Sequence, residues 1–226
     1  MKKNFILTFV MVLMLAPLTF ADNISYDKSD FQKVSDVIYD AVYDIRYYSD
    51  NNFTGHRING YKAPVAYMTK EGLNALSLAA KDLRKQGYRL LIWDTYRPQK
   101  AVDDFVAWIN NPVDKGDKTF YPKLEKSQLL EGQYIMAKSG HSRGSTLDLS
   151  IIKKVGAFVD MGGTFVLFSE ISHPDYNKLT KKQKKNRKIL HDAMIKAGFI
   201  GIDSEWWHFT LKDEPYKDTY FNFDVE

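Results

Sequence analysis

Three short polar stretches of the sequence contain the side chains best suited to chemistry. In SGHSRGSTLDLS, His141 is followed seven residues later by Asp148, and in SEWWHF, Glu205 stands three residues before His208. The third stretch, WDTYRP, contributes the cation Arg97. A catalytic zinc ion takes three protein ligands, commonly histidine and carboxylate, and keeps a fourth position for water. The three stretches together therefore suggest a metal site with charged neighbours.

The expected positions of these residues favour convergence on one ion. His141 lies in a glycine-flanked loop that leads into a strand, and Asp148 lies on that strand. His208 is the best third ligand, because Glu205 then places beside the metal a carboxylate that can accept and return a proton. The spacing alone also fits ordinary structural roles, since single histidines near strands and Glu-x-x-His pairs occur in many proteins without a metal.

The composition limits both the ligand chemistry and the class of protein. The chain of 226 residues contains no cysteine, so a metal site must use histidine and carboxylate. Its 44% hydrophobic residues suffice for one domain with a sizeable core. The net charge of +4 comes from interspersed basic and acidic residues, which does not favour binding to nucleic acid. Nothing in the composition indicates an oligomeric state.

The N-terminal segment has the pattern of a secretory signal. Two lysines precede the apolar run FILTFVMVLMLAPLTF, and small residues lead up to Ala21. We expect cleavage of a signal peptide, 1–21, and a single mature domain, 22–226, that is exported to the periplasm or secreted. An uncleaved membrane anchor is the alternative, but the run is short and Pro17 interrupts it. After cleavage no stable association with the membrane is expected.

Hydrophobic periodicity and turn residues predict the elements that position the polar stretches. Helices are predicted within 69–88, 98–110 and 183–197, strands over 88–94, 145–152 and, as the last one, 206–211, and a mild helical pattern over 31–45. Residues 46–62 and 111–135 are predicted to be irregular, the second with a short helical turn. Gly87 stands where the first of these helices should end.

The strand over 145–152 alternates between apolar and polar residues. Leu147, Leu149 and Ile151 share one face, and Thr146, Asp148 and Ser150 share the other. We therefore expect an α+β fold, in which a mostly antiparallel sheet carries helices on one face. The metal site is expected on the other, open face, which holds Asp148.

These stretches together resemble the D-alanyl-D-alanine dipeptidases (VanX-type), a branch of the zinc D,D-peptidases that share a fold with the hedgehog signalling domain. SGHSRGSTLDLS contains the pattern Ser-x-His-x-x-Gly-x-x-x-Asp of the wider group, and SEWWHF contains its Glu-x-x-His. Finer matches to the dipeptidase branch are NNFTG at 51–55, GYRLLIWDTYRP at 87–98, SRGS at 142–145 and MGG at 161–163. The resemblance covers nearly the whole mature chain in order.

The resemblance implies a role for each polar residue. His141, Asp148 and His208 become the ligands of one zinc ion per chain, and Glu205 becomes the catalytic base. Arg97 becomes the residue that stabilises the oxyanion, and Tyr47 and Ser139 match family positions that line the substrate pocket. Asp94, three residues before Arg97, is expected to orient Arg97 or to cap the loop, and we count it with Tyr47 and Ser139 among the substrate-binding residues.

The activity implied is hydrolysis of D-Ala-D-Ala or a closely related small D-amino-acid dipeptide by metal-activated water. Two alternatives remain open at this point. One is a D,D-carboxypeptidase or endopeptidase that cuts the stem peptides of peptidoglycan. The other is a binding module for wall peptides without catalysis, although such a module needs neither Glu205 nor Arg97.

One position departs from the resemblance. The dipeptidases commonly show Met-Gly-x-x-Phe-Asp, whose aspartate helps to hold the ammonium group of the free dipeptide, whereas this chain has MGGTFV, ending in Val166. Valine offers no charge-assisted hydrogen bond to an ammonium group. Either another acid such as Glu170 substitutes for the missing carboxylate, or selectivity for a free amino terminus is relaxed.

Overall fold

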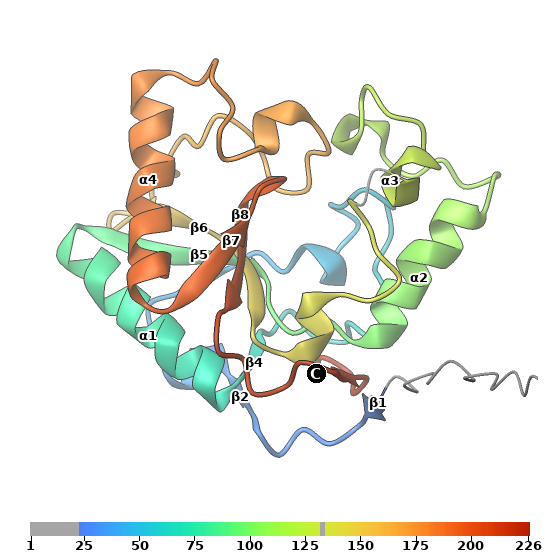
Figure 1. Cartoon of the computed structure of the whole chain (residues 1–226), viewed down its shortest axis with the longest axis horizontal. Coiled ribbons are helices and arrows are strands. Elements are labelled where there is room, and N and C mark those ends of the chain that lie inside the picture. Colours follow the sequence, from blue (N-terminus) through green and yellow to red (C-terminus); the bar gives the residue numbers. More distant parts are fainter. Residues whose placement is uncertain (1–22, 132–133) are drawn as a thin grey trace, which may run out of the picture.

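The computed structural model describes residues 23–131 and 134–226, and the predicted signal peptide therefore lies outside the described residues. A five-stranded sheet forms the centre of the fold (Figure 1). Its strands, in spatial order, are β3 (Val42–Tyr43), β5 (Tyr88–Asp94), β6 (Thr146–Lys153), β8 (Glu205–Leu211) and β7 (Phe199–Ile202). Among the four strand pairs of this sheet, the β3–β5 pair is parallel and the other three are antiparallel. The prediction of a mostly antiparallel sheet is confirmed.

Two long helices cover one side of this sheet. They are α1 (Lys70–Lys85) and α4 (Lys181–Lys196), which contact each other as well as β5 and β7 (Figure 1). Both begin with a threonine cap: the Thr69 hydroxyl accepts from the Gly72 amide, and Thr180 forms a capping box with Gln183. Gly87 follows α1 with a φ of 87°, the left-handed conformation typical of a helix end.

Two shorter helices lie on the other side of the sheet from α1 and α4 (Figure 1). They are α2 (Gln99–Asn110), which follows Pro98, and α3 (Gln128–Glu131), the short turn expected in the long connection. The buried side chains of α2 include Val102 and Phe105, which line a pocket beside the sheet. Within the described residues, no helix has both the length and the hydrophobicity that crossing a bilayer requires.

Two small sheets and several 3-10 helices lie outside the central sheet. Two further two-stranded sheets pair β1 (Asn23–Ser25) with β9 (Thr219–Phe221) and β2 (Phe31–Lys33) with β4 (Tyr67–Thr69). Five 3-10 helices complete the described elements: η1 (Val34–Asp36), η2 (Arg46–Tyr48), η3 (Lys118–Phe120), η4 (Gly140–Arg143) and η5 (Glu170–Ser172).

Two predictions about these elements are wrong. Residues 31–45 do not form a helix; they form β2, η1 and β3, because pairing with β4 and β5 outweighs a weak helical pattern. The strand predicted over 206–211 is not the last one, since β9 follows it and pairs with β1 at the other end of the chain. Both errors concern pairing partners that are distant in the sequence.

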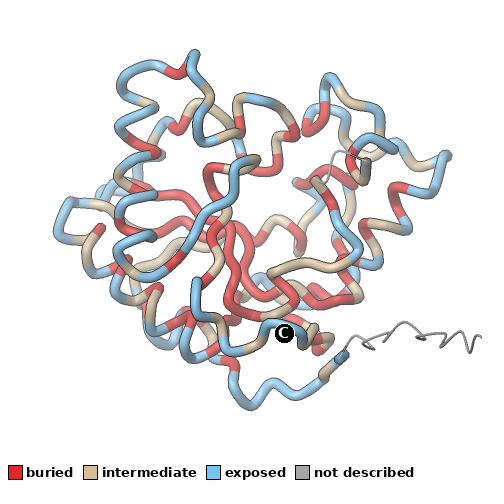
Figure 2. The backbone as a smooth tube through the Cα atoms, in the orientation of Figure 1, coloured by how far each residue is buried: buried red, intermediate tan, exposed pale blue. Residues whose placement is uncertain are grey.

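The polar face of β6 is also not open to solvent. Thr146, Asp148 and Ser150 are all buried, and the central strands are buried along most of their length (Figure 2). Aromatic side chains from three other segments pack together above this face; Phe53 lies 5.0 Å from Phe105 and 5.4 Å from Phe168 between ring centroids. Of these three polar residues, Asp148 lines a pocket whose wall includes the aromatic side chains.

Candidate active site

Three neighbouring strands place the polar residues in a row. In the β5–β6 pair Asp94 stands opposite Asp148, and in the β6–β8 pair Asp148 stands opposite His208. The register of β5 shifts between Ile92 and Asp94. Such a bulge redirects a side chain relative to regular alternation, and bulges of this kind are common next to active sites.

A second irregularity brings Glu205 and His208 to the same pocket. Residues three apart on a regular strand point to opposite faces of the sheet. Here Gly201 of β7 pairs with Phe209, but the next residue, Ile202, pairs with Glu205. Residues 206–208 thus bulge between two successive pairs. As a result, both Glu205 and His208 line one cavity.

The loop before β6 fixes the orientation of His141. The Ser139 hydroxyl caps η4 by accepting a hydrogen bond from the His141 amide at 3.2 Å. The carbonyl of Thr95 lies 2.7 Å from His141 Nδ1, and a carbonyl can only accept, so Nδ1 carries the proton. The lone pair of Nε2 therefore points towards Asp148 and His208, in the way that a second partner orients a metal-binding histidine.

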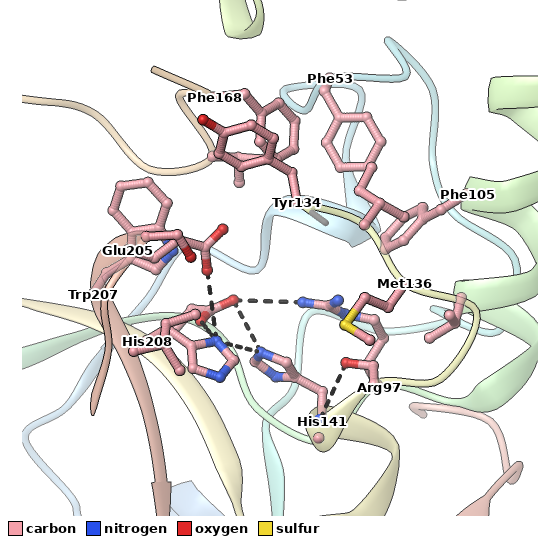
Figure 3. A pocket seen from close by; sticks show the side chains of 18 of the residues that line it. Phe53, Arg97, Phe105, Tyr134, Met136, His141, Phe168, Glu205, Trp207 and His208 are labelled. Carbon is pink, nitrogen blue, oxygen red and sulfur yellow. Dashed lines mark hydrogen bonds and ion pairs between the residues drawn. The ribbon is translucent and has the colours of Figure 1, made fainter. Parts of the chain in front are cut away.

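The three predicted ligands have the mutual distances of a metal site. His141 Nε2 lies 3.2 Å from Asp148 Oδ2 and 3.3 Å from His208 Nδ1, and His208 Nδ1 lies 3.0 Å from Asp148 Oδ1 (Figure 3). Ligand atoms about 2.0 Å from a tetrahedral ion are separated from one another by roughly 3.3 Å. The two distances to Asp148 involve different carboxylate oxygens, and one ligand atom from each of the three residues lies within 4.8 Å of the other two, close enough to share a single ion.

The charges of these residues also fit a bound cation. Burial lowers the pKa of His141, so its ring is neutral and presents a lone pair to a carboxylate. Burial alone would raise the pKa of Asp148, but His141 and His208 outweigh it and hold that pKa below its usual range. Burial opposes the charged form of His208, yet its hydrogen bond to Asp148 raises the pKa of this histidine. The positive charge of a metal ion would offset both the cost of burying the Asp148 carboxylate and its repulsion with the lone pair of His141.

Arg97 is held at the edge of the triad by several partners. Its Nε donates to Asp94 Oδ2 at 2.9 Å, and its Nη2 lies 3.4 Å from Asp148 Oδ2. The guanidinium carbon lies 4.9 Å from the Tyr47 ring centroid and 5.3 Å from that of Phe105. Burial by itself would lower the pKa of Arg97. The neighbouring side chains of Tyr47 and Asp94 outweigh this effect and raise the pKa above its usual range, so the guanidinium stays charged.

Glu205 points into the same space. Its Oε2 lies 3.6 Å from His208 Nδ1 (Figure 3). Burial raises the pKa of Glu205 to about 7, against the opposing influence of His208. A carboxylate with a pKa near neutrality can both take and return a proton at working pH.

These residues line a cavity of about 230 Å³. Of the residues predicted for the site, it brings together Tyr47, Arg97, Ser139, His141, Asp148, Glu205 and His208. Asp94 does not line the cavity but lies behind Arg97, where the Tyr61 hydroxyl donates to Asp94 Oδ1 at 2.6 Å. Asp94 therefore holds Arg97 through a hydrogen bond and, unlike Tyr47 and Ser139, does not line the cavity.

The apolar wall of the cavity was not predicted. It includes Phe53, Phe105, Tyr134, Phe165, Phe168 and Trp207, several of which appear in Figure 3. In the sequence these residues look like ordinary core positions, and no local pattern connects them. Tyr61 was missed for the same reason, because its partner Asp94 lies 33 residues away.

A sheet that gathers two histidines and an aspartate, with a glutamate beside them, has the architecture of a metallopeptidase. The Peptidase M15 family, described as D-ala-D-ala dipeptidase, matches residues 27–226, and the chain belongs to this family of metallopeptidases. The resemblance suggested by the three polar stretches is confirmed.

Curated relatives agree with this assignment. The chain is 38% identical over 198 residues to a D-alanyl-D-alanine dipeptidase of Streptomyces coelicolor, covering 87% of this chain and 98% of the relative. It is 38% identical over 200 residues to a protein of the same name from Enterococcus faecalis, covering 88% and 99%. A third, from Enterococcus faecium, is 35% identical over 198 residues, covering 87% and 98%.

Proposed function

We propose that this chain is a zinc-dependent dipeptidase that hydrolyses D-Ala-D-Ala or a closely related D-dipeptide. The observation that carries the proposal is the convergence of His141, Asp148 and His208, with ligand atoms within 4.8 Å of one another, inside a pocket that Glu205 and Arg97 also line. The family membership and the names of the relatives supply the substrate class.

In this proposal the three triad residues hold the metal ion. Two imidazole nitrogens and a carboxylate oxygen form a donor set that suits zinc, and the absence of cysteine in the chain agrees with it. When bound, zinc supplies Lewis acidity, which lowers the pKa of water and polarises a peptide carbonyl. The Thr95 carbonyl keeps His141 Nε2 unprotonated and ready to bind the ion.

The chain's own charged residues carry the proton and stabilise the developing charge. Glu205 takes the proton from the attacking water and returns it to the leaving amine, because its carboxylate lies beside His208 and faces the cavity. Arg97 stabilises the negative charge that develops on the former carbonyl oxygen. Asp94 holds the Arg97 guanidinium in place through a hydrogen bond of 2.9 Å to Nε.

The remaining predicted residues position the substrate. Burial raises the pKa of Tyr47, so its hydroxyl keeps its proton and can donate to the substrate. The Ser139 hydroxyl accepts from the His141 amide and still has a proton to donate. A cavity of about 230 Å³ is smaller than the ~300–1,000 Å³ typical of pockets for drug-sized ligands, which favours a short substrate.

The direct test is hydrolysis of free D-Ala-D-Ala by the purified chain. We expect release of D-Ala by the zinc-loaded protein, loss of activity when a chelator removes the metal, and recovery when zinc is restored. An intact metal site without hydrolysis of this dipeptide or of longer D-Ala-D-Ala peptides would instead support a binding module for wall peptides.

We also propose that the mature protein acts outside the cytoplasm, in the periplasm or the surrounding medium. The support is the signal pattern of residues 1–21 with its expected cleavage after Ala21. Expression of the full chain in a bacterial host, followed by cell fractionation and N-terminal sequencing, tests this directly. Recovery of an uncleaved protein from the cytoplasm would contradict export.

A further inference from the structure

Val166 is the one non-glycine residue of the described chain with a positive φ, at 57°. The left-handed region is unfavourable for a β-branched side chain, whereas asparagine and aspartate tolerate it better. The side chain is 4% exposed and lines the active-site cavity. The surrounding structure must therefore hold this backbone in place, because strained conformations persist only where their neighbours determine them.

Helix α4 supplies part of that support through Arg187. Its guanidinium donates to three carbonyls of the segment that contains Val166: Nε to Met161 at 2.7 Å, Nη2 to Ile171 at 2.7 Å and Nη1 to His173 at 2.9 Å. These bonds fix both ends of the segment 161–173. The segment that carries Val166 is thus held in one conformation by hydrogen bonds to α4.

The part of the cavity wall around Val166 has no acidic side chain among the described residues. Among the described residues that line the cavity, the two carboxylates are Asp148 and Glu205, and both lie beside His208, at 3.0 and 3.6 Å from its Nδ1. Glu170, the nearest acid in sequence to Val166, is exposed and does not line the cavity. Beside Val166 the wall continues with the aromatic Phe165 and Phe168.

The apolar wall around Val166 offers no partner to the charged amino end of a substrate that lies against it. A buried ammonium group without a carboxylate partner loses its hydration and gains no charge-assisted hydrogen bond. An amide nitrogen, which is neutral, loses much less. Strong selection for a free amino terminus requires a polar partner that a blocked substrate leaves unpaired, and Val166 offers none.

We propose that Val166 is a specificity-determining residue that admits D-Ala-D-Ala with an acylated amino nitrogen, as at the end of a longer peptide, almost as well as the free dipeptide. This inference rests on the proposed dipeptidase function and specifies its substrate class. It concerns the amino end of the substrate only, and leaves the metal triad and Glu205 in the roles given above.

The test compares kcat/KM for D-Ala-D-Ala and for N-acetyl-D-Ala-D-Ala in the wild type, Val166→Asp and Val166→Asn. For the wild type we expect the two values to lie within about tenfold of each other. Val166→Asp should increase the preference for the free dipeptide by roughly tenfold or more, the effect of one charge-assisted hydrogen bond. Val166→Asn has the same shape without the charge and should keep the wild-type ratio.

Thermal unfolding distinguishes the effect of relieved backbone strain from the effect of the added charge. Both variants relieve the strain of valine at a positive φ, so Val166→Asn should melt at or above the wild-type temperature while its substrate ratio stays unchanged. If the wild type hydrolyses the free dipeptide and rejects the acetylated one by about a hundredfold or more, this inference is overturned and the dipeptidase function stands. If the zinc-loaded wild type hydrolyses neither, the proposed function itself is overturned.

Discussion

Glu205 and His208 line the same cavity although they stand three residues apart on one β-strand. The shift of register that pairs Ile202 with Glu205 and Gly201 with Phe209 makes this possible. Without the bulge, regular alternation would direct one of the two side chains to the face covered by α4. The local irregularity of β8 therefore places the proposed metal ligand and the proposed proton-transferring carboxylate in one cavity.

Loss of either histidine of the triad should abolish metal binding. His141→Ala or His208→Ala leaves two protein ligands, which rarely hold catalytic zinc, so we expect less than stoichiometric zinc and no hydrolysis. Elemental analysis of the purified variants measures the metal content. His191→Ala, which changes an exposed histidine of α4, is the matched control and should retain the zinc. Full occupancy in either triad variant would contradict the ligand assignment.

Arg97→Ala should keep the zinc and lower kcat more than it changes KM. Loss of one group that stabilises an oxyanion typically reduces the rate by about 10²–10³. Steady-state kinetics on D-Ala-D-Ala give both constants. Arg57→Ala, at an exposed position of the loop after η2, removes the same charge away from the cavity and should have little effect. An effect confined to KM would mean that Arg97 binds substrate and transition state equally.

Arg187→Met should weaken both the fold and substrate binding. The substitution removes the Arg187 donor from the carbonyls of Met161 and Ile171, for which the described residues show no other donor, while the His173 carbonyl keeps the Tyr176 amide. Each buried acceptor left unsatisfied costs ~1–3 kcal/mol. We expect a lower Tm and a raised KM with zinc content unchanged. Lys188→Met, at the next and solvent-exposed position of α4, is the control. A variant with a lower Tm but wild-type KM would show that Arg187 stabilises the fold without setting the cavity wall.

The elements with strong local patterns were predictable from the sequence. The strand over 88–94 has the predicted bounds, and α1, α2 and α4 lie where apolar periodicity and capping residues indicated. The grouping of His141, Asp148 and His208 was also predictable, because the spacing of these residues matched a known family. Each of these signals is contained in a short window of sequence.

The features that were not predictable depend on distant segments. Residues 31–45 form strands because β4 and β5 pair with them. The polar face of β6 is buried because aromatic residues from several loops and α2 cover it. The strain at Val166 is a backbone property that no sequence pattern displays. A pocket wall assembled from separate segments becomes visible only in the folded chain.

The central claim is that Glu205 moves the proton in a metal-dependent hydrolysis of D-Ala-D-Ala. Its most direct test is turnover of the free dipeptide by wild type and Glu205→Gln at matched zinc occupancy, with Glu170→Gln as the exposed control. An amide cannot accept the proton of the attacking water, so we expect full zinc content and a fall in kcat of at least about 10²-fold in Glu205→Gln. Near-normal turnover in that variant, with zinc bound, would contradict this account of the site.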